Sequence, residues 1–204
     1  MSRAAALREY DDTTESDHII VLHDVSWEDY ERILKIRGEH SAPRISYLEG
    51  ELEIMSPGKD HEIIKSYIGR LLEAWCVDHD IEFTPVGNWT LKKKRKRRGA
   101  EADECYIFGT KEQSLPHLAI EVEWTHGGID KLAIYEKLGV EEVWYWSKGV
   151  IEIYILTEGK LTETQHSRLF PELDLALLTS MLDRPTLSQA VRDFRKALGR
   201  RRSR

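Results

Sequence analysis

Hydrophobic positions recur along the chain with two periods, and each period predicts a type of element. Spacing of three to four residues, which indicates an amphipathic helix, is strongest over 60–78. Shorter helical patterns cover 26–37, which opens with a capping-box-like serine and acid, and 130–138, which a glycine follows. Two further helices are predicted over 171–182, with proline at a tolerated first position, and 187–198.

Alternation with a period of two predicts the strands. Two strands over 44–55 would form one hairpin, and two over 142–156 would form another. Further strands are predicted over 81–85, 88–92, 103–108, 117–124 and 161–167. The sequence therefore predicts one mixed α/β domain over 1–204, a mixed sheet flanked by helices, with flexible ends at 1–18 and 199–204.

Two short acidic segments, 101–104 and 120–124, contain the candidate chemistry. The second alternates apolar and acidic residues, so a strand would place Glu121 and Glu123 on one face. Asp103 at the end of one strand and Glu121 inside the next can hold a hard cation, because Mg²⁺ takes oxygen ligands and usually one or two carboxylates. The alternative is a pair of surface carboxylates on an edge strand, but an unpaired charge within an apolar strand is costly.

The composition, 41% hydrophobic and 32% charged over 204 residues, is typical of a soluble globular protein. No apolar run approaches the roughly 18 residues of a membrane span. The apolar patch within 1–7 is too short for a signal peptide. With only Cys76 and Cys105, we predict a reducing cytoplasm and two buried thiols, and neither a disulfide nor a metal pair.

Basic residues are concentrated in two places, although the net charge is −6. Six lie within 195–204, and seven are consecutive: Lys92, Lys93, Lys94, Arg95, Lys96, Arg97 and Arg98. Without these thirteen, 17 basic residues remain against 36 acidic ones, a charge of −19. This distribution suggests local attraction to a polyanion, and a solvated loop and tail are the alternative. The run at 92–98 could follow a phosphate backbone without reading bases.

An ordered series of short motifs runs through the centre of the chain. None is specific alone, but their order is. They are Tyr47–Pro57, His61 at a helix start, Gly99–Tyr106, Leu118–Val122, Asp130–Lys131 with Tyr135, and Leu138–Trp144. Together they resemble the Uma-type putative restriction endonuclease family, within the PD-(D/E)XK nuclease superfamily. The resemblance covers about 45–160.

The resemblance implies a restriction-endonuclease-like core, with helices on both faces of a mixed sheet. It implies Asp103 and Glu121 as the two metal carboxylates. The superfamily often has a lysine where this chain has Glu123, and the family's pattern moves that lysine's function to the next helix, here to Lys131. Most members have proline where this chain has Ala102, a change expected to affect strand entry more than chemistry.

Five further residues could assist the site, and each has a structural alternative. Glu123, about 7 Å along the strand from the second carboxylate, could bind metal through water or a second ion, or lie at the rim. Tyr135 shares a helix face with the candidate lysine and could serve only packing. His61 could contact phosphate or assist the base, or be a surface histidine. Glu51 or Glu53, on one strand face, could be an accessory ligand.

These observations predict a DNA endonuclease that depends on Mg²⁺ or Mn²⁺. A cation held by Asp103 and Glu121 would activate water for attack on a phosphodiester, with Lys131 assisting. A two-fold dimer would suit cutting both strands of DNA. The glutamate at position 123 leaves open an inactive nucleic-acid-binding module on the nuclease scaffold. The acidic body leaves open a protein-interaction domain that never touches nucleic acid.

Overall fold

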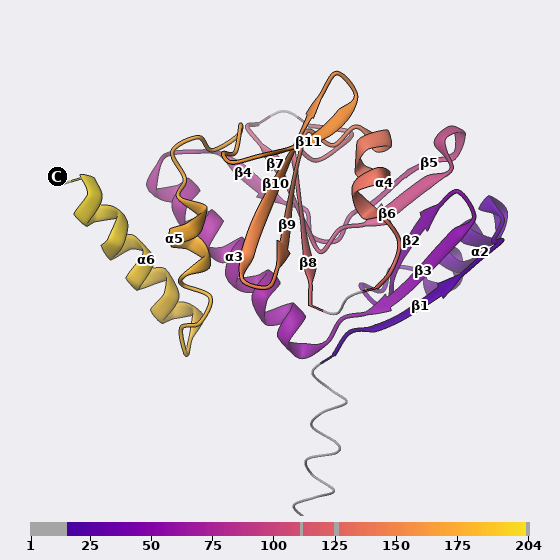
Figure 1. Ribbon diagram of the computed structural model, residues 1–204, viewed down its shortest axis with the longest axis horizontal. Helices are drawn as coiled ribbons and strands as arrows, with labels where there is room; N and C mark the ends of the chain where they lie inside the picture. The colour runs from indigo at the N-terminus through magenta and orange to yellow at the C-terminus, as the bar shows by residue number, and fades with distance from the viewer. Residues whose placement is uncertain (1–15, 111, 125–126, 203–204) are drawn as a thin grey trace, which may run out of the picture.

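The computed structural model describes residues 16–110, 112–124 and 127–202. Its fold is mixed α/β, with two sheets and helices packed against their faces (Figure 1). The N-terminal sheet has the strand order β1-β3-β2-β6-β5, and the central sheet has the order β11-β10-β9-β8-β7-β4. The predicted α/β class with flanking helices is confirmed, with the strands divided between two sheets.

The strands of the N-terminal sheet are all antiparallel to their neighbours. They are β1 (His18–Leu22), β2 (Arg44–Leu48), β3 (Glu51–Ser56), β5 (Thr90–Lys93) and β6 (Arg98–Glu101). The predicted turn between β2 and β3 has Gly50 at positive φ, which glycine adopts without strain. Helix α2 (Trp27–Arg37), capped by the Ser26 side chain as predicted, covers one face, where Tyr30 stacks on Tyr47. The other face packs against α4 (Lys131–Leu138) of the central part of the fold.

The central sheet contains one parallel pair, β8 with β9, among antiparallel ones. Its strands are β4 (Phe83–Pro85), β7 (Glu104–Phe108), β8 (Leu118–Glu123), β9 (Glu142–Ser147), β10 (Val150–Thr157) and β11 (Lys160–Thr164). A parallel pair needs a crossover, and this one is α4 (Lys131–Leu138). Asp130 caps this helix and Gly139 ends it in the left-handed conformation, as predicted.

Helices cover both faces of the central sheet. Helices α3 (Lys59–Asp78), α5 (Leu175–Thr179) and α6 (Leu187–Arg202) share a core with Ile120 and Val122 of β8. Helix α4 lies on the opposite face, between the two sheets, and shares a second core with β6 and β8 (Figure 1). Alternate residues of β8 therefore face α3 and α4, and the acidic ones face α4.

Some predicted elements differ from the structure. The basic run is not a loop: it includes the end of β5, the short 3-10 helix η1 (Lys94–Lys96) and the start of β6. The predicted strands at 81–85 and 88–92 pair in different sheets, as β4 and β5. The helix predicted over 171–182 is limited to α5, because Asp174 caps it and leaves Pro171 outside.

The two terminal segments expected to be flexible are partly described. Asp17 is buried and His18 begins β1, a strand that was not predicted although four of its five residues are apolar. At the other end, α6 continues to Arg202. The remaining parts of the expectations for 1–15, the turn at 125–126 and 203–204 lie outside the described residues.

Cys76 and Cys105 are buried free thiols, as predicted. Burial raises the pKa of Cys76 to about 12 and holds the pKa of Cys105 well above its ordinary value. No helix within the described ranges is long and apolar enough to cross a membrane.

Candidate active site

The structure places Asp103 beside the strand that carries Glu121, although Asp103 precedes β7 and does not lie on the strand predicted for it. Asp103 lies in the connection between β6 and β7, and Glu121 lies inside β8. In the β7–β8 pair, Glu104 is opposite Ile120. The backbone N–H of Val122 donates to Asp103 Oδ2 at 2.7 Å, which ties the aspartate to β8. Both acids are 1% exposed, so this is a buried carboxylate pair rather than two surface acids on an edge strand.

Two cationic side chains hold the Asp103 carboxylate. Arg44, the first residue of β2, forms an ion pair with Oδ1, and His61, in the first turn of α3, places Nε2 3.0 Å from Oδ2. The Nδ1 atom of His61 lies 3.1 Å from Asp17 Oδ2, so the imidazole lies between two buried carboxylates. Burial opposes its positive charge, but the hydrogen bonds to Asp103 and Asp17 raise the pKa of His61 to about 9.

These contacts keep Asp103 ionised. With a proton on each ring nitrogen, His61 donates to both carboxylates, and Arg44 Nη1, 2.9 Å from His61 Nε2, donates to the other oxygen of the same aspartate. Burial would raise the pKa of Asp103, but Arg44 and His61 hold it well below its ordinary value.

Residues of α4 hold Glu121. Lys131 Nζ lies 2.9 Å from Glu121 Oε2, and the Tyr135 hydroxyl donates to Oε1. Lys131 also lies 3.7 Å from Glu53 Oε1 of β3, so it stands between carboxylates of both sheets. Burial would lower the pKa of Lys131, but the charges of Glu121, Asp103 and Glu53 raise it above its ordinary value. The lysine is therefore an ammonium ion at neutral pH.

The two carboxylates are shifted in opposite directions. Burial raises the pKa of Glu121, and the neighbouring Asp103 charge adds to this, while Lys131 opposes it. The pKa of Asp103, in contrast, is lowered. Neighbouring acids whose environments separate their pKa values are characteristic of functional sites.

Two hollows flank the carboxylate pair. The smaller, about 30 Å³, has room for about one water molecule. Its wall includes Glu53, Glu121, Glu123, Lys131 and Tyr145. The larger, about 350 Å³, is lined in part by Arg44, Glu62, Lys65, Asn88 and Asp103. Each candidate carboxylate therefore belongs to the wall of a different hollow.

Of the five accessory candidates, three contact the site directly, one lines the smaller hollow and one lies apart. His61, Glu53 and Tyr135 contact the carboxylates or the lysine between them. Glu123 lines the smaller hollow and accepts a hydrogen bond from Ser147 Oγ at 3.0 Å. Glu51 does not join the site, because it pairs with His23 at 3.3 Å.

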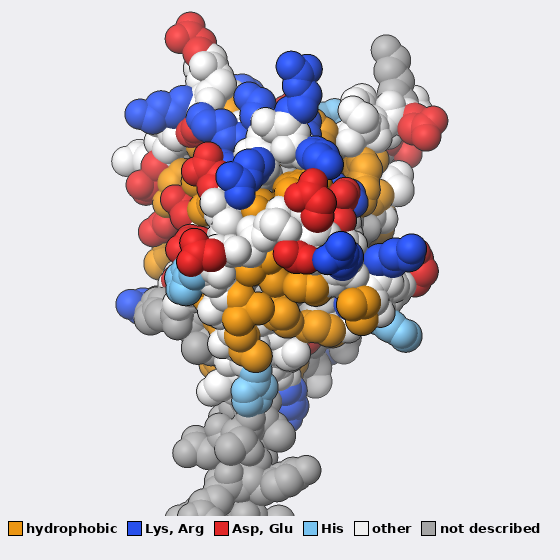
Figure 2. All heavy atoms as spheres, turned by 90° about the vertical axis from the view of Figure 1, so that its right-hand side faces the viewer, with side chains coloured by type: hydrophobic (Ala, Val, Ile, Leu, Met, Phe, Trp, Pro, Cys, Tyr) orange, Lys and Arg blue, Asp and Glu red, His pale blue; other side chains and the backbone are white. Residues whose placement is uncertain are grey.

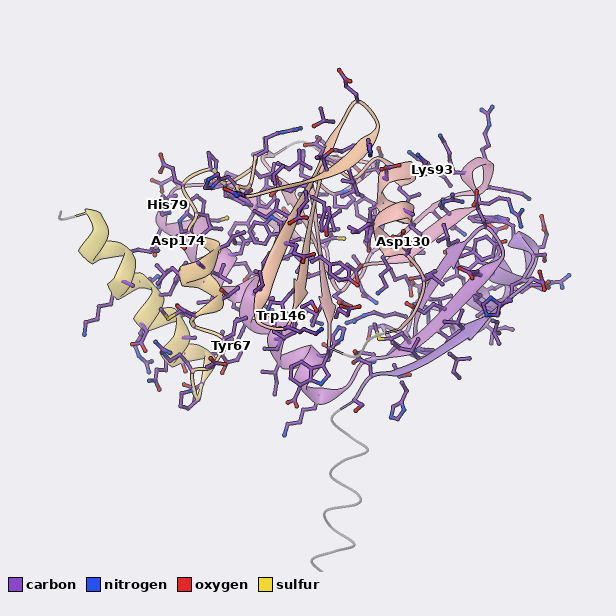
Figure 3. All side chains as sticks on the ribbon, viewed as in Figure 1. Tyr67, His79, Lys93, Asp130, Trp146 and Asp174 are labelled. Carbon is purple, nitrogen blue, oxygen red and sulfur yellow. The ribbon has the colours of Figure 1, made fainter. Side chains whose placement is uncertain are left out.

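The basic run does not reach the carboxylates. Several of its side chains form ion pairs with acids nearby, Lys92 with Glu31 at 3.2 Å, Lys94 with Glu28 at 3.1 Å and Arg98 with Glu49 at 3.0 Å. Figure 2, which views this end of the molecule, shows blue and red side chains interspersed rather than a uniform basic face. Lys93 donates to the Leu138 carbonyl at the C-terminus of α4, about 10 Å along the helix from Lys131. In Figure 3 the labels for Lys93 and Asp130 mark the two ends of this helix.

Sequence reasoning missed Asp17 and Arg44. Asp17 lies in a polar segment without periodicity, so the sequence contains no signal that would have identified it. Arg44 opens a predicted strand, where a charged residue is usually a solvated end, yet its side chain is 4% exposed. Both residues act on Asp103, directly or through His61.

The two carboxylates are of the ligand type that a hard divalent cation takes, although protein donors already contact all four of their oxygens. Asp103 and Glu121 offer carboxylate oxygens, which Mg²⁺ and Mn²⁺ prefer. Within the described ranges, no group of three or more His, Cys, Asp or Glu side chains is placed to hold a metal ion. Two carboxylates nevertheless suit Mg²⁺, which usually keeps water and substrate phosphate as its other ligands. The Lys131 ammonium beside Glu121 already places a positive charge at this position.

Comparison with known proteins identifies the family. The sequence matches the family model described as Uma2, putative restriction endonuclease, over residues 27–187. No curated protein matches it. The fold is similar to the crystal structure of a putative nuclease belonging to DUF820 from Anabaena variabilis, with a TM-score of 0.52 and 14% identity, over 75% of this chain and 98% of that one. The family match covers most of the chain, and the chain therefore belongs to the Uma2 family of putative restriction endonucleases.

Proposed function

We propose that the protein is a DNA endonuclease that hydrolyses phosphodiester bonds with Mg²⁺ or Mn²⁺. The observation that carries this proposal is the buried pair Asp103 and Glu121, which the hydrogen bond from the Val122 N–H to Asp103 holds beside each other, in a chain of this family. Burying a carboxylate is costly. Two buried carboxylates placed side by side are therefore expected to have a functional role that offsets this cost.

Asp103 and Glu121 would hold the cation, which when bound supplies charge neutralisation at the phosphate and activation of a water molecule. Arg44 and His61 fix the orientation of Asp103 and keep it ionised. The Lys131 ammonium, 2.9 Å from Glu121, can donate to an oxygen of the scissile phosphate or of the attacking water. Arg44 and His61 would therefore position the Asp103 carboxylate, and Lys131 would stabilise negative charge that develops on the phosphate or the water.

Two further parts of the proposal concern the substrate. Arg95 and Lys96, exposed at the tip of the β5–β6 hairpin, would attract DNA without sequence specificity. A two-fold dimer would direct two such sites at opposite strands. Plasmid nicking that becomes double-strand cleavage only at protein concentrations where dimers form would support the dimer.

The test is a titration of Mg²⁺ and Mn²⁺ by calorimetry, with nicking of supercoiled plasmid under the same conditions. Asp103→Asn and Glu121→Gln are expected to abolish nicking and saturable metal binding while leaving DNA binding largely intact. Equal loss of DNA binding and of cleavage in folded variants would count against the proposal. So would metal binding and nicking at the wild-type level.

Glu142→Gln is the matched control. Glu142 is also 1% exposed and lies on the neighbouring strand β9. Its carboxylate accepts from Trp144 Nε1 at 2.7 Å and from the Arg168 backbone N–H at 2.9 Å, and it lines neither hollow. This variant is expected to keep metal binding and nicking, so a loss there would mean that any buried charge change disables the protein.

One observation favours a second candidate, an inactive nucleic-acid-binding module. Arg44 and Lys131 already neutralise the two carboxylates in the absence of metal. In that case the wild type would bind DNA with a steep salt dependence, but it would bind no metal and nick no plasmid. Replacing Arg95 and Lys96 with alanine would then be the damaging change.

A further inference from the structure

The larger hollow beside Asp103 has the size and the lining of a ligand pocket. Its volume of about 350 Å³ falls within the usual range for small-molecule sites. Its wall includes two cations, Arg44 and Lys65, the polar side chains of Ser41, Ser56 and Asn88, and the carboxylates of Glu62, Asp103 and Glu104. None of these residues contributes to the smaller hollow that contains Lys131.

Arg44 is the more buried of the two cations, and one of its donors has no partner in the described part of the chain. Its side chain is 4% exposed, with Nη1 on Asp103 and Nη2 2.6 Å from Glu62 Oε1. Its Nε–H is buried and has no hydrogen-bond partner among the described residues. A buried donor without an acceptor is unfavourable, so an oxygen that reaches this atom when Glu62 moves away would stabilise it.

Glu62 occupies the position that a second anion would take. Its two carboxylate oxygens bridge the cations of the pocket, Oε1 at 2.6 Å from Arg44 and Oε2 at 2.5 Å from Lys65. Lys65 is 17% exposed, whereas Glu62 is 40% exposed and can rotate into solvent. A tetrahedral anion with two or more free oxygens could replace it at both cations.

The start of α3 adds to this preference for an anion. The helix has 20 residues, its N-cap Gly58 makes no side-chain hydrogen bond to the first turn, and that turn contains the acids Asp60 and Glu62. Pro57, next to this cap, lines the pocket. The N-terminus of a long helix carries partial positive charge and free N–H groups, which favour phosphate.

We propose that this pocket binds one nucleotide of the substrate strand, next to the scissile phosphate, through Arg44, Lys65 and the start of α3. Glu62 occupies the anion position until the nucleotide phosphate displaces it. Ser41 and Asn88 border the same space and can contact the sugar or base. The inference rests on the proposed nuclease function, because the pocket shares Asp103 with that site.

The test measures binding of thymidine 5′-monophosphate and of inorganic phosphate by calorimetry, without metal and without cleavage. Lys65→Met is expected to weaken nucleotide binding about threefold to tenfold, and Glu62→Gln to tighten it by a similar factor, the size of one partly screened charge contact. The opposite signs matter, because the two residues are ion-pair partners and a purely structural role would make both variants worse.

Arg70→Met is the matched control. Arg70 lies on the same helix, is 53% exposed and pairs with Glu73 at 2.6 Å, away from the pocket lining. It should leave nucleotide binding unchanged. Changes of the same sign in Lys65→Met and Glu62→Gln, or no change in either, would overturn the proposal. Equal affinity for nucleotide and inorganic phosphate would overturn the nucleotide assignment.

The two proposals can fail separately. If the wild type nicks plasmid but the Lys65 and Glu62 variants show none of the expected binding changes, the pocket alone is refuted. A wild type that binds the nucleotide with the expected changes but never nicks DNA refutes the nuclease and supports the pocket.

Discussion

Replacing Lys131 with methionine tests whether one buried lysine balances the carboxylates of both sheets. The lysine side chain is 11% exposed and lies 2.9 Å from Glu121 and 3.7 Å from Glu53, whose side chains are 2% and 4% exposed. Methionine keeps the unbranched apolar stem and removes the charge. Two buried acids then lose their counter-charge, so we expect a folded protein of lower stability.

Removing one partner of a buried ion pair costs about 3–5 kcal/mol. We expect about 3 kcal/mol, because Glu121, whose pKa is already raised by burial, can take up a proton and relieve part of the repulsion. For a chain of this size, each kcal/mol lowers the melting temperature by about 2–4 °C. The melting temperature of Lys131→Met should therefore fall by about 6–12 °C.

A divalent cation is expected to reverse much of this loss. If the metal binds beside Glu121, it supplies the charge that the variant lacks. At a concentration one hundred times its Kd, a ligand stabilises the folded state by about 2.7 kcal/mol. The assay is thermal unfolding followed by circular dichroism, with and without Mg²⁺ or Mn²⁺, for Lys131→Met and the wild type.

Lys137→Met, on the same helix, is the control. Lys137 is 45% exposed and pairs with Glu136 at 2.6 Å, so its loss should change stability by no more than about 0.5 kcal/mol. Equal melting temperatures for the two variants would refute the charge balance that we derive for Lys131. A large loss that metal does not reverse would retain that balance and refute a metal beside Glu121.

Three further predictions concern other buried groups. Because burial raises the pKa of Cys76 to about 12 and that of Cys105 well above its ordinary value, a thiol reagent at pH 8 should label neither cysteine in the native protein and both after unfolding. Asp17→Asn should lower the pKa of His61 from about 9, which the proton NMR titration of its imidazole would measure; an unchanged value would mean that this contact is absent. Glu101→Gln should cost about 1–3 kcal/mol in chemical denaturation, because its buried carboxylate accepts from a backbone N–H and two side chains, and it should leave metal titrations unchanged.

The elements around Glu121 were predictable because their signals are local. The alternation of β8 assigns its acids to one face, and the structure has that face toward α4. The cap at Asp130 and the stop at Gly139 fix α4 within one residue of the predicted bounds. Lys131 and Tyr135, one turn apart, then necessarily share a helix face, which makes both available to the same carboxylate.

The other half of the site was not predictable, because its contacts are distant in sequence. Asp17 is 44 residues from His61, and Arg44 is 59 residues from Asp103. Strand β1 pairs with the edge of β3, and its β-branched residues Ile19, Ile20 and Val21 favour a strand, but a single run of five residues does not indicate the distant strand that it pairs with. The partners of the basic run were not predictable for the same reason: several of its charges are ion-paired to acids on α2 and in the β2–β3 turn.

The contact of Glu53 with the start of α4 explains why the site requires both sheets. From β3, Glu53 accepts a hydrogen bond from the Ile129 backbone N–H at 3.0 Å and faces Lys131 with its other oxygen. Gly128 permits this approach, because its φ is +119° and a Cβ atom there would lie 2.2 Å from Glu53 Oε2. The N-terminal sheet thus holds the segment just before α4 through Glu53. This contact directs Lys131 toward Glu121 on the central sheet. Glu53 therefore acts as a positioning residue for Lys131. The lysine is held beside Glu121 in this way only when the two sheets are packed together.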